Sequence, residues 1–168
     1  ARKVDAAAVQ AGAEVDRFVF YDALTIFEPK VEIDWMKGGG VRVRNASDEV
    51  YPHVFAIRVR NGNCESAYRK SLGKGEQVEM KLEVGAPRAM AAILTESGLY
   101  RKEAEGLVEI WKDEFFGAEG VRLLLVTPRA VYDRLLPLSV APAPAKVERV
   151  LIAHIECADE VRRAQIAT

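Results

Sequence analysis

Two continuous apolar runs in the C-terminal part of the chain constrain its fold more than any other feature. They occupy residues 121–126 (Val-Arg-Leu-Leu-Leu-Val) and 150–153 (Val-Leu-Ile-Ala). Apolar runs of this length are typical of strands covered on both faces, so we expect both at the centre of the fold. The segment between them is punctuated by prolines, which predicts a short helix over about 128–136 and then a stiff connection.

The charge balance excludes some classes of partner. The 168 residues include 24 Lys and Arg against 25 Asp and Glu, for a net charge of -1. Such a chain has no overall field to hold nucleic acid or an anionic membrane surface. No apolar run approaches the ~20 residues that span a bilayer. We therefore expect no nucleic-acid partner and no membrane insertion in this stretch.

Alternation of apolar and polar residues through the first half predicts a series of short antiparallel strands. Glycines at 38–40 predict a hairpin, and Asn61-Gly62 is the strongest hairpin signal in the chain. Turns recur every eight to twelve residues or so, as in a small sandwich. The expected strands lie near residues 18–20, 31–35, 41–44, 55–59, 64–69 and 78–82.

The spacing of apolar residues changes from that of strands to that of helices at Gly85-Ala86-Pro87. Pro87 suits the first position of a short helix that ends near Gly98. A second helix is predicted over about 100–116, because Ala104, Leu107, Trp111 and Phe115 recur on one face. We expect this face to join the two apolar strands, so that Leu123, Leu125, Ile152 and Trp111 belong to one contiguous core.

These patterns predict an α+β fold, with an antiparallel β-sandwich-like lobe followed by a helical hairpin and a short buried sheet. The predicted organisation is a linker at 1–14, a β-rich lobe at 15–84, an α/β lobe packed on it at 85–158 and a polar tail at 159–168. The two lobes are expected to form one unit.

The cysteines leave two possibilities open. Cys64 and Cys157 lie far apart in the sequence, and neither belongs to a CxxC pattern. In an exported protein they could form one disulfide that closes a long loop, but two small buried thiols are equally consistent with their positions.

Six short segments of the sequence lie at residues 18–21, 98–104, 110–111, 123–130, 135–138 and 141–144. In this order they resemble a group of conceptual proteins from bacterial genomes in which an export signal precedes a similar region. The group has no assigned activity, so the resemblance implies a periplasmic, envelope or secreted location and no catalytic residues. The chain begins Ala1-Arg2-Lys3 without a methionine, which fits either a removed signal or a trimmed chain.

The densest polar cluster in the sequence is basic. If Val43, Ile57 and Val59 point inward, the arginines between them share the outer face of their strands. Such a strip could bind an anionic polymer, although cross-strand pairing with acids on neighbouring strands is favoured because equal numbers of acids are available. The arginines are Arg42, Arg44, Arg58 and Arg60, and the acids are Glu32, Asp34, Glu79 and Glu83.

His154 and Glu156 lie two residues apart on one predicted strand and hence on one face, where a carboxylate could tune an imidazole as a general base. With His53 and Arg58 they are the candidate residues for catalysis, although a structural role is favoured for both histidines. The sequence contains no HxxxH motif, no CxxC motif and no Asp-rich loop. The spacing of its His, Cys and Asp residues therefore does not predict a set of metal ligands. We expect no cofactor and no resident metal.

The absence of a chemical motif favours a non-enzymatic binding or scaffolding module of the bacterial envelope or exterior, with a protein partner. Exposed strand edges of a small antiparallel sheet could accept a partner strand. The alternative is a hydrolase-like small-molecule enzyme with a scattered active site. That alternative requires the histidines and a carboxylate to converge in a concave site.

Overall fold

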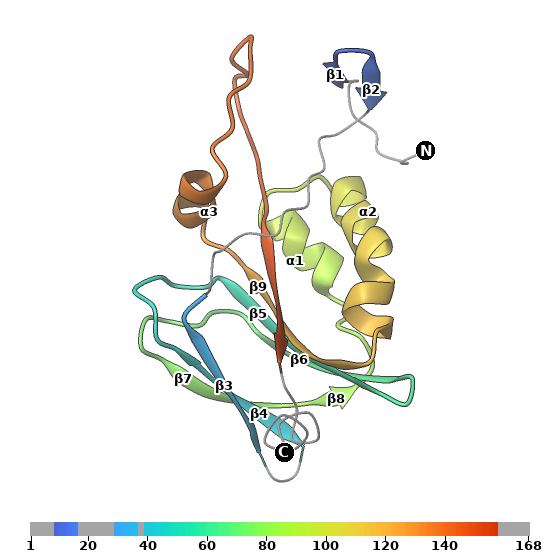
Figure 1. Cartoon of the computed structure of the whole chain (residues 1–168), viewed down its shortest axis with the longest axis vertical. Coiled ribbons are helices and arrows are strands. Elements are labelled where there is room, and N and C mark those ends of the chain that lie inside the picture. Colours follow the sequence, from blue (N-terminus) through green and yellow to red (C-terminus); the bar gives the residue numbers. More distant parts are fainter. Residues whose placement is uncertain (1–8, 17–28, 37–38, 158–168) are drawn as a thin grey trace, which may run out of the picture.

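The computed structural model describes residues 9–16, 29–36 and 39–157. Within these residues the predicted α+β class is confirmed by two antiparallel sheets that pack against each other, three α-helices and one π-helical turn (Figure 1). The strand predicted around Phe18 and Phe20 and the polar tail predicted at 159–168 lie outside the described residues.

The larger sheet has five strands in the order β10-β9-β5-β6-β8, and every neighbouring pair is antiparallel. The predicted hairpin at Asn61-Gly62 joins β5 to β6, and both turn residues have positive φ, as a two-residue turn of this kind requires. The strands are β5 (His53–Arg60), β6 (Asn63–Arg69), β8 (Glu83–Val84), β9 (Gly120–Val126) and β10 (Ile152–Cys157).

The smaller sheet has three antiparallel strands in the order β3-β4-β7. The strands are β3 (Val31–Met36), β4 (Gly40–Asn45) and β7 (Gln77–Lys81). A separate hairpin is formed by β1 (Val9–Ala11) and β2 (Glu14–Asp16), where the sequence had predicted a linker as far as residue 14.

Helices cover the face of the larger sheet that is turned away from the smaller one (Figure 1). They are α1 (Met90–Glu96), α2 (Arg101–Lys112) and the π-helical turn η1 (Asp113–Gly117), while α3 (Arg129–Leu135) follows β9. The side chain of Glu103 accepts a hydrogen bond from the backbone N–H of Tyr100, which closes the first turn of α2. None of the described helices is long and apolar enough to cross a membrane.

The five-stranded sheet separates two apolar cores. One lies between the sheets and contains Leu123 and Leu125, while the other lies under the helices and contains Leu124, with Ile152 and Trp111 packed against it. The prediction that Leu123, Leu125, Ile152 and Trp111 share one core is therefore wrong. Successive residues of a strand point to opposite faces, so one strand covered on both faces serves two cores.

The predicted buried strand at 121–126 is confirmed as β9, whose residues from Val121 to Val126 are all buried. It pairs on one side with β5, from His53 opposite Val126 to Val59 opposite Gly120, and on the other with β10. The short sheet expected in the second half of the chain is thus continuous with strands from the first half. The second apolar run differs from prediction, because β10 begins at Ile152 and is a half-buried edge strand.

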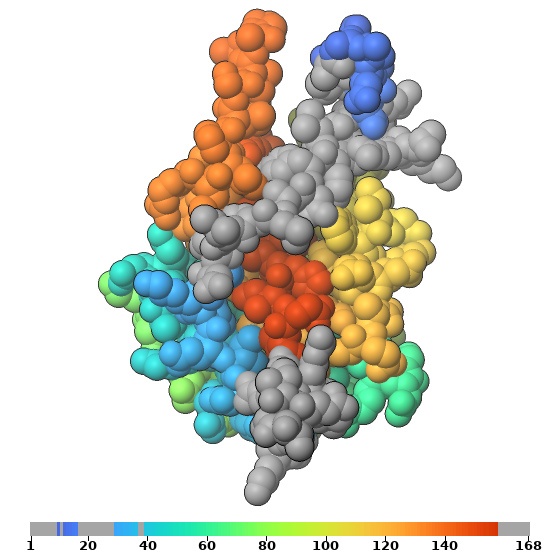
Figure 2. Space-filling view, in the orientation of Figure 1, coloured from blue at the N-terminus to red at the C-terminus, as the bar shows by residue number. Residues whose placement is uncertain are grey.

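A long extended arm connects α3 to β10. It projects from the body of the molecule before it descends directly into β10 (Figures 1 and 2), and its residues 137–146 are all exposed. The prolines of this arm explain why it makes no strand ladder, since proline cannot donate a backbone hydrogen bond.

The two cysteines are both free thiols. Cys64 packs against the core under the helices, whereas Cys157 packs against the core between the sheets. Their strands, β6 and β10, are separated by β5 and β9. A disulfide between them is therefore excluded by the fold.

Candidate functional site

The arginines expected to form a basic strip divide between the two sheets. Arg42 and Arg44 lie on β4, and each is paired across the sheet, as the favoured interpretation predicted. Arg42 is 2.7 Å from Glu79 and Arg44 is 3.0 Å from Glu32, measured between side-chain nitrogen and oxygen atoms. These pairs are solvated, so they contribute little to stability.

Arg58 lies on β5, on the face that it shares with Val54 and Ala56 toward the smaller sheet. Ile57 points inward as expected, into the core under the helices, but the face of Arg58 is covered as well, by the smaller sheet. Arg58 donates to Glu65 at 2.6 Å, and this bond holds the pKa of Glu65 below its ordinary value.

The split between sheets means that the four arginines do not form one surface. Arg60 is exposed and, by alternation along β5, lies on the side of Arg58. The guanidinium of Arg58 also lies 5.9 Å from the centroid of the Trp35 ring on β3. Arg58 therefore belongs to the contact between the two sheets, while Arg42 and Arg44 lie on the smaller sheet.

His53 lies at the start of β5 on the side of the helices. Its Nδ1 is 2.9 Å from the hydroxyl of Tyr68, and the two rings are stacked. Burial is the main cause that lowers the pKa of His53 below its ordinary value of 6.5. This environment is that of a structural histidine, because the neutral ring is favoured and its partner is a phenol.

We expect His53 to make the folded protein more sensitive to mild acid. Because the pKa of His53 is lower in the folded than in the unfolded chain, the unfolded chain binds more protons as the pH falls through and below 6.5. The free energy of unfolding should therefore decrease as the pH is lowered through this window. The decrease should be smaller in His53→Gln, measured by urea unfolding at several pH values. An unchanged pH slope would show that His53 is not held in its neutral form.

His154 and Glu156 lie on one face of β10, as their spacing predicted. His154 Nε2 is 2.8 Å from Glu156 Oε1, and the rings of His154 and Phe115 are nearly perpendicular with their centroids 5.8 Å apart. His154 is half-buried, whereas the carboxylate of Glu156 is exposed. Sequence reasoning correctly placed this pair but not its neighbours.

The neighbour that sequence reasoning missed is Arg122, an arginine inside the apolar run of β9. Its side chain is only 1% exposed, and its Nε donates to Glu156 Oε1 at 3.0 Å. The other guanidinium nitrogens donate to four backbone carbonyls at the end of η1 and just after it. The acceptors are the carbonyls of Glu114, Phe115, Ala118 and Glu119.

Arg122 therefore satisfies the carbonyls that a helix end leaves without partners, and it ties η1 to β9 and β10. Glu156 opposite Arg122 is fixed by the register of the two strands. A signal was present in the sequence, because a single arginine in a run of apolar residues must be paired when it is buried.

A third carboxylate, that of Glu114 on η1, completes the cluster around His154. One donor atom from each of Glu114, His154 and Glu156 lies within 4.8 Å of the others. No local pattern relates Glu114 to the β10 pair, because η1 and β10 meet only through the tertiary fold. We refer to these three residues as the Glu114 triad.

The four residues proposed for catalysis do not converge. His53 and His154 point to the same side of the sheet, but they are two strands and two residues apart, which separates their Cα atoms by about 12 Å. Arg58 lies on the opposite face and is bound to Glu65. This arrangement does not support the hydrolase-like alternative built on these residues.

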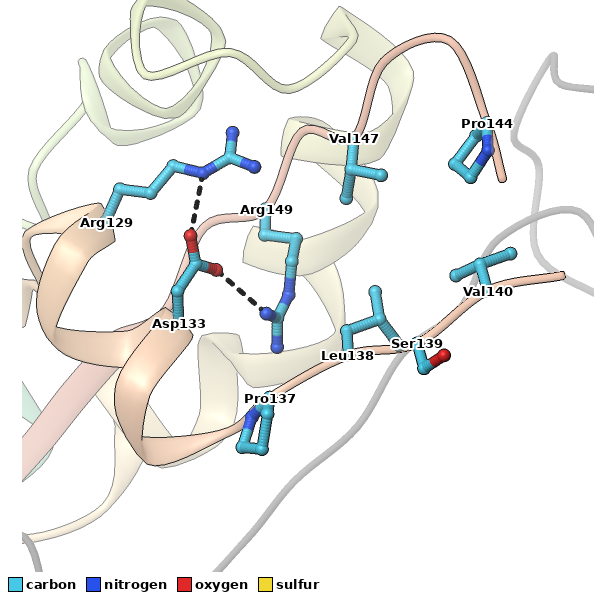
Figure 3. A pocket seen from close by; sticks show the side chains of 9 residues that line it. All are labelled: Arg129, Asp133, Pro137, Leu138, Ser139, Val140, Pro144, Val147 and Arg149. Atoms are coloured by element: carbon cyan, nitrogen blue, oxygen red, sulfur yellow. Dashed lines mark hydrogen bonds and ion pairs between the residues drawn. The ribbon is translucent and has the colours of Figure 1, made fainter. Parts of the chain in front are cut away.

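A hollow of about 480 Å³ lies elsewhere, between α3 and the base of the arm (Figure 3). Asp133 joins its two guanidinium groups, at 3.2 Å from Arg129 Nε and 2.9 Å from Arg149 Nη1. The side chain of Arg149 is only 9% exposed and also donates to the carbonyl of Leu136 at 2.7 Å. These charged groups bind one another, and their contacts attach the base of the arm to α3.

β10 lies at one edge of the five-stranded sheet. Among the described residues no strand pairs with its outer side. Thr127 N donates to Leu151 O at 2.8 Å, and this bond sets the alternation of the ladder. The backbone groups of Ile152, His154 and Glu156 therefore point outward. The atoms of β10 lie at the surface between the smaller sheet and α2 (Figure 2).

Comparison of the chain with protein-family models, with curated proteins and with solved structures gave no match.

Proposed function

We propose that the protein is a non-enzymatic binding module that takes up an extended segment of a partner protein along the outer edge of β10. The observation that carries the proposal is the open edge itself. β10 supplies outward backbone groups at Ile152, His154 and Glu156, and an added strand would satisfy them.

The burial of β10 supports this function. Its residues from Ile152 to Ile155 are all half-buried, although β9 beside it is fully buried from Val121 to Val126. Ala153 and Ile155 face the core between the sheets, and Ile152 faces the core under the helices. A further strand would cover apolar surface on both faces of the edge.

Within the described residues, the outer edge of β10 lacks three of the features that block strand addition in other proteins: proline, lysine and a β-bulge. β10 contains no proline and no lysine, and its six residues follow β9 without a bulge in their register. Exposed edges without such protection readily accept another strand. We expect a partner segment of about six residues in which apolar side chains alternate with polar ones.

The resemblance to exported bacterial proteins supports a location in the envelope or outside the cell.

The experiment is a selection of random eight-residue peptides displayed on phage, with the full chain as the immobilised target. Enriched peptides should show apolar residues at alternate positions. Their affinity should fall by at least about tenfold in Ile152→Pro, because proline removes an outward N–H and places its ring on the side of the incoming strand. The first position of an edge strand tolerates proline, so β10 itself should persist.

The matched control is Ile152→Ala, which removes the same side chain and keeps the backbone N–H. Its affinity should stay within a few-fold of that of the unaltered chain. Equal losses in the two variants would show that the side chain binds and not the strand edge. Selected peptides that ignore both substitutions would contradict the proposed site.

A further inference from the structure

We propose that the Glu114 triad is an exchangeable binding site for a divalent transition-metal ion of the zinc class. The proposal concerns the side chains on the helix side of β10, so it is independent of strand binding at the edge. It adds Glu114 to the two residues that sequence spacing placed together. Spacing predicted no resident metal, and the site proposed here would take up its ion reversibly.

The donor set suits such an ion. One imidazole nitrogen and two carboxylate oxygens, all within 4.8 Å of one another, come from His154, Glu156 and Glu114. Zinc binds these donors at about 2.1 Å, which places the donors of a tetrahedral site about 3.4 Å apart. The three side chains therefore need only small rotations to share one ion, and a water molecule would take the fourth position.

The two elements that hold the donors are fixed. Glu156 and His154 lie on β10, which is paired with β9 along its whole length. Glu114 lies on η1, whose end is bound by the guanidinium of Arg122. π-helical turns are frequent at functional sites, and η1 directly continues α2 as its last turn. Here η1 brings Glu114 toward β10.

The carboxylate of Glu114 differs from the other two side chains of the Glu114 triad in its contacts. It forms no hydrogen bond or ion pair with any residue that the structure describes. Glu156, by contrast, is bound to Arg122 and His154 through Oε1. Arg122 and the two carboxylates together carry a net charge of -1, so within this group of three described residues one negative charge is not balanced. A cation between the carboxylates would compensate it.

Arg122 also limits the strength of the site. Its charge lies 3.0 Å from Glu156 Oε1 and repels an approaching cation. An ion would also replace the hydrogen bond between His154 Nε2 and Glu156 Oε1. With three protein ligands, two of them exposed, the site is open to solvent. It therefore resembles an open three-ligand zinc site more than a closed structural one.

The experiment is a calorimetric titration of the metal-free full chain with zinc chloride. We expect one ion per chain and an affinity that falls by at least about tenfold in Glu114→Gln and in His154→Ala, since each removes one of three ligands. Glu114→Gln is the cleaner variant because its carboxylate has no other partner among the described residues. Its urea unfolding midpoint without metal should equal that of the unaltered chain.

The chain offers matched controls. His53→Gln removes the other histidine, and Cys157→Ser removes the nearest cysteine in sequence, which faces the opposite side of β10. Both variants should bind zinc as the unaltered chain does. In the nitrogen-15 spectrum of the imidazoles, zinc should shift Nε2 of His154 and leave His53 unchanged. Binding that persists in Glu114→Gln, or that is lost in Cys157→Ser, would overturn the proposal.

Discussion

Replacing Arg122 with alanine should lower the free energy of unfolding by at least about 3 kcal/mol, because each buried backbone carbonyl that is left without a donor costs about 1 to 3 kcal/mol. The guanidinium is 1% exposed and binds Glu156 and four backbone carbonyls at the end of η1. Without it, those carbonyls face the interior with fewer donors, and η1 loses its attachment to β9. Urea unfolding followed by circular dichroism measures the change.

Two variants sharpen this result. Arg122→Lys keeps the charge but presents a single ammonium group in place of the planar guanidinium, so it should restore only part of the lost stability. Arg44→Ala removes an exposed arginine that pairs with Glu32 on the smaller sheet, and it should leave the unfolding midpoint nearly unchanged. Equal effects of Arg122→Ala and Arg44→Ala would contradict the structural role of the buried guanidinium.

Replacing Leu125 with alanine should cost about 2 to 5 kcal/mol of unfolding free energy. Leu125 is fully buried on β9, between Val54 of β5 and Ala153 of β10, and its side chain lies in the core between the sheets. The truncation leaves a cavity where two sheets meet, and strands paired on both sides cannot easily move to fill it.

The control for this truncation is Val84→Ala on β8, where the side chain is 90% exposed. It should change stability by less than about 0.5 kcal/mol, as surface substitutions usually do. A loss under about 1 kcal/mol in Leu125→Ala would show that β9 is not the central strand of the fold.

The class of fold was predictable because local patterns agreed with the final structure. The alternation at 31–35, the turn at Asn61-Gly62 and the stripe on the second helix all became the elements they predicted. The assignment of faces was less predictable. In β5 both sets of alternate residues contain apolar side chains, with Phe55 and Ile57 in one set and Val54 and Ala56 in the other. The alternation therefore could not show which set faces the helices.

The error at β5 was to place Arg58 on an outer face, and it explains why a single arginine strip was expected. Arg42 and Arg58 lie on different sheets, a separation that no local pattern reports. The partner of Arg58 was within reach, however, because a two-residue turn at Asn61-Gly62 places Arg58 opposite Glu65. The turn places Arg60 opposite Asn63, and counting two residue pairs away from the turn places Arg58 opposite Glu65.

The candidate sites were partly predictable. His154 and Glu156 share a face because the period of a strand is two residues. Glu114 could not be found in this way, since 40 residues separate it from His154 and only the packing of η1 on the sheet brings them together. The open edge of β10 was also beyond prediction, because a continuous apolar run favours a central strand and not an edge.

Amide hydrogen exchange along β10 tests most directly the claim that its outer edge binds a strand. In the free protein the amides of Ala153 and Ile155 should exchange slowly, because they donate to β9, while those of Ile152, His154 and Glu156 should exchange quickly. On addition of a selected peptide, the three fast amides should become protected together. Outward amides that are already protected in the free protein, or that stay fast when the peptide is bound, would contradict the account.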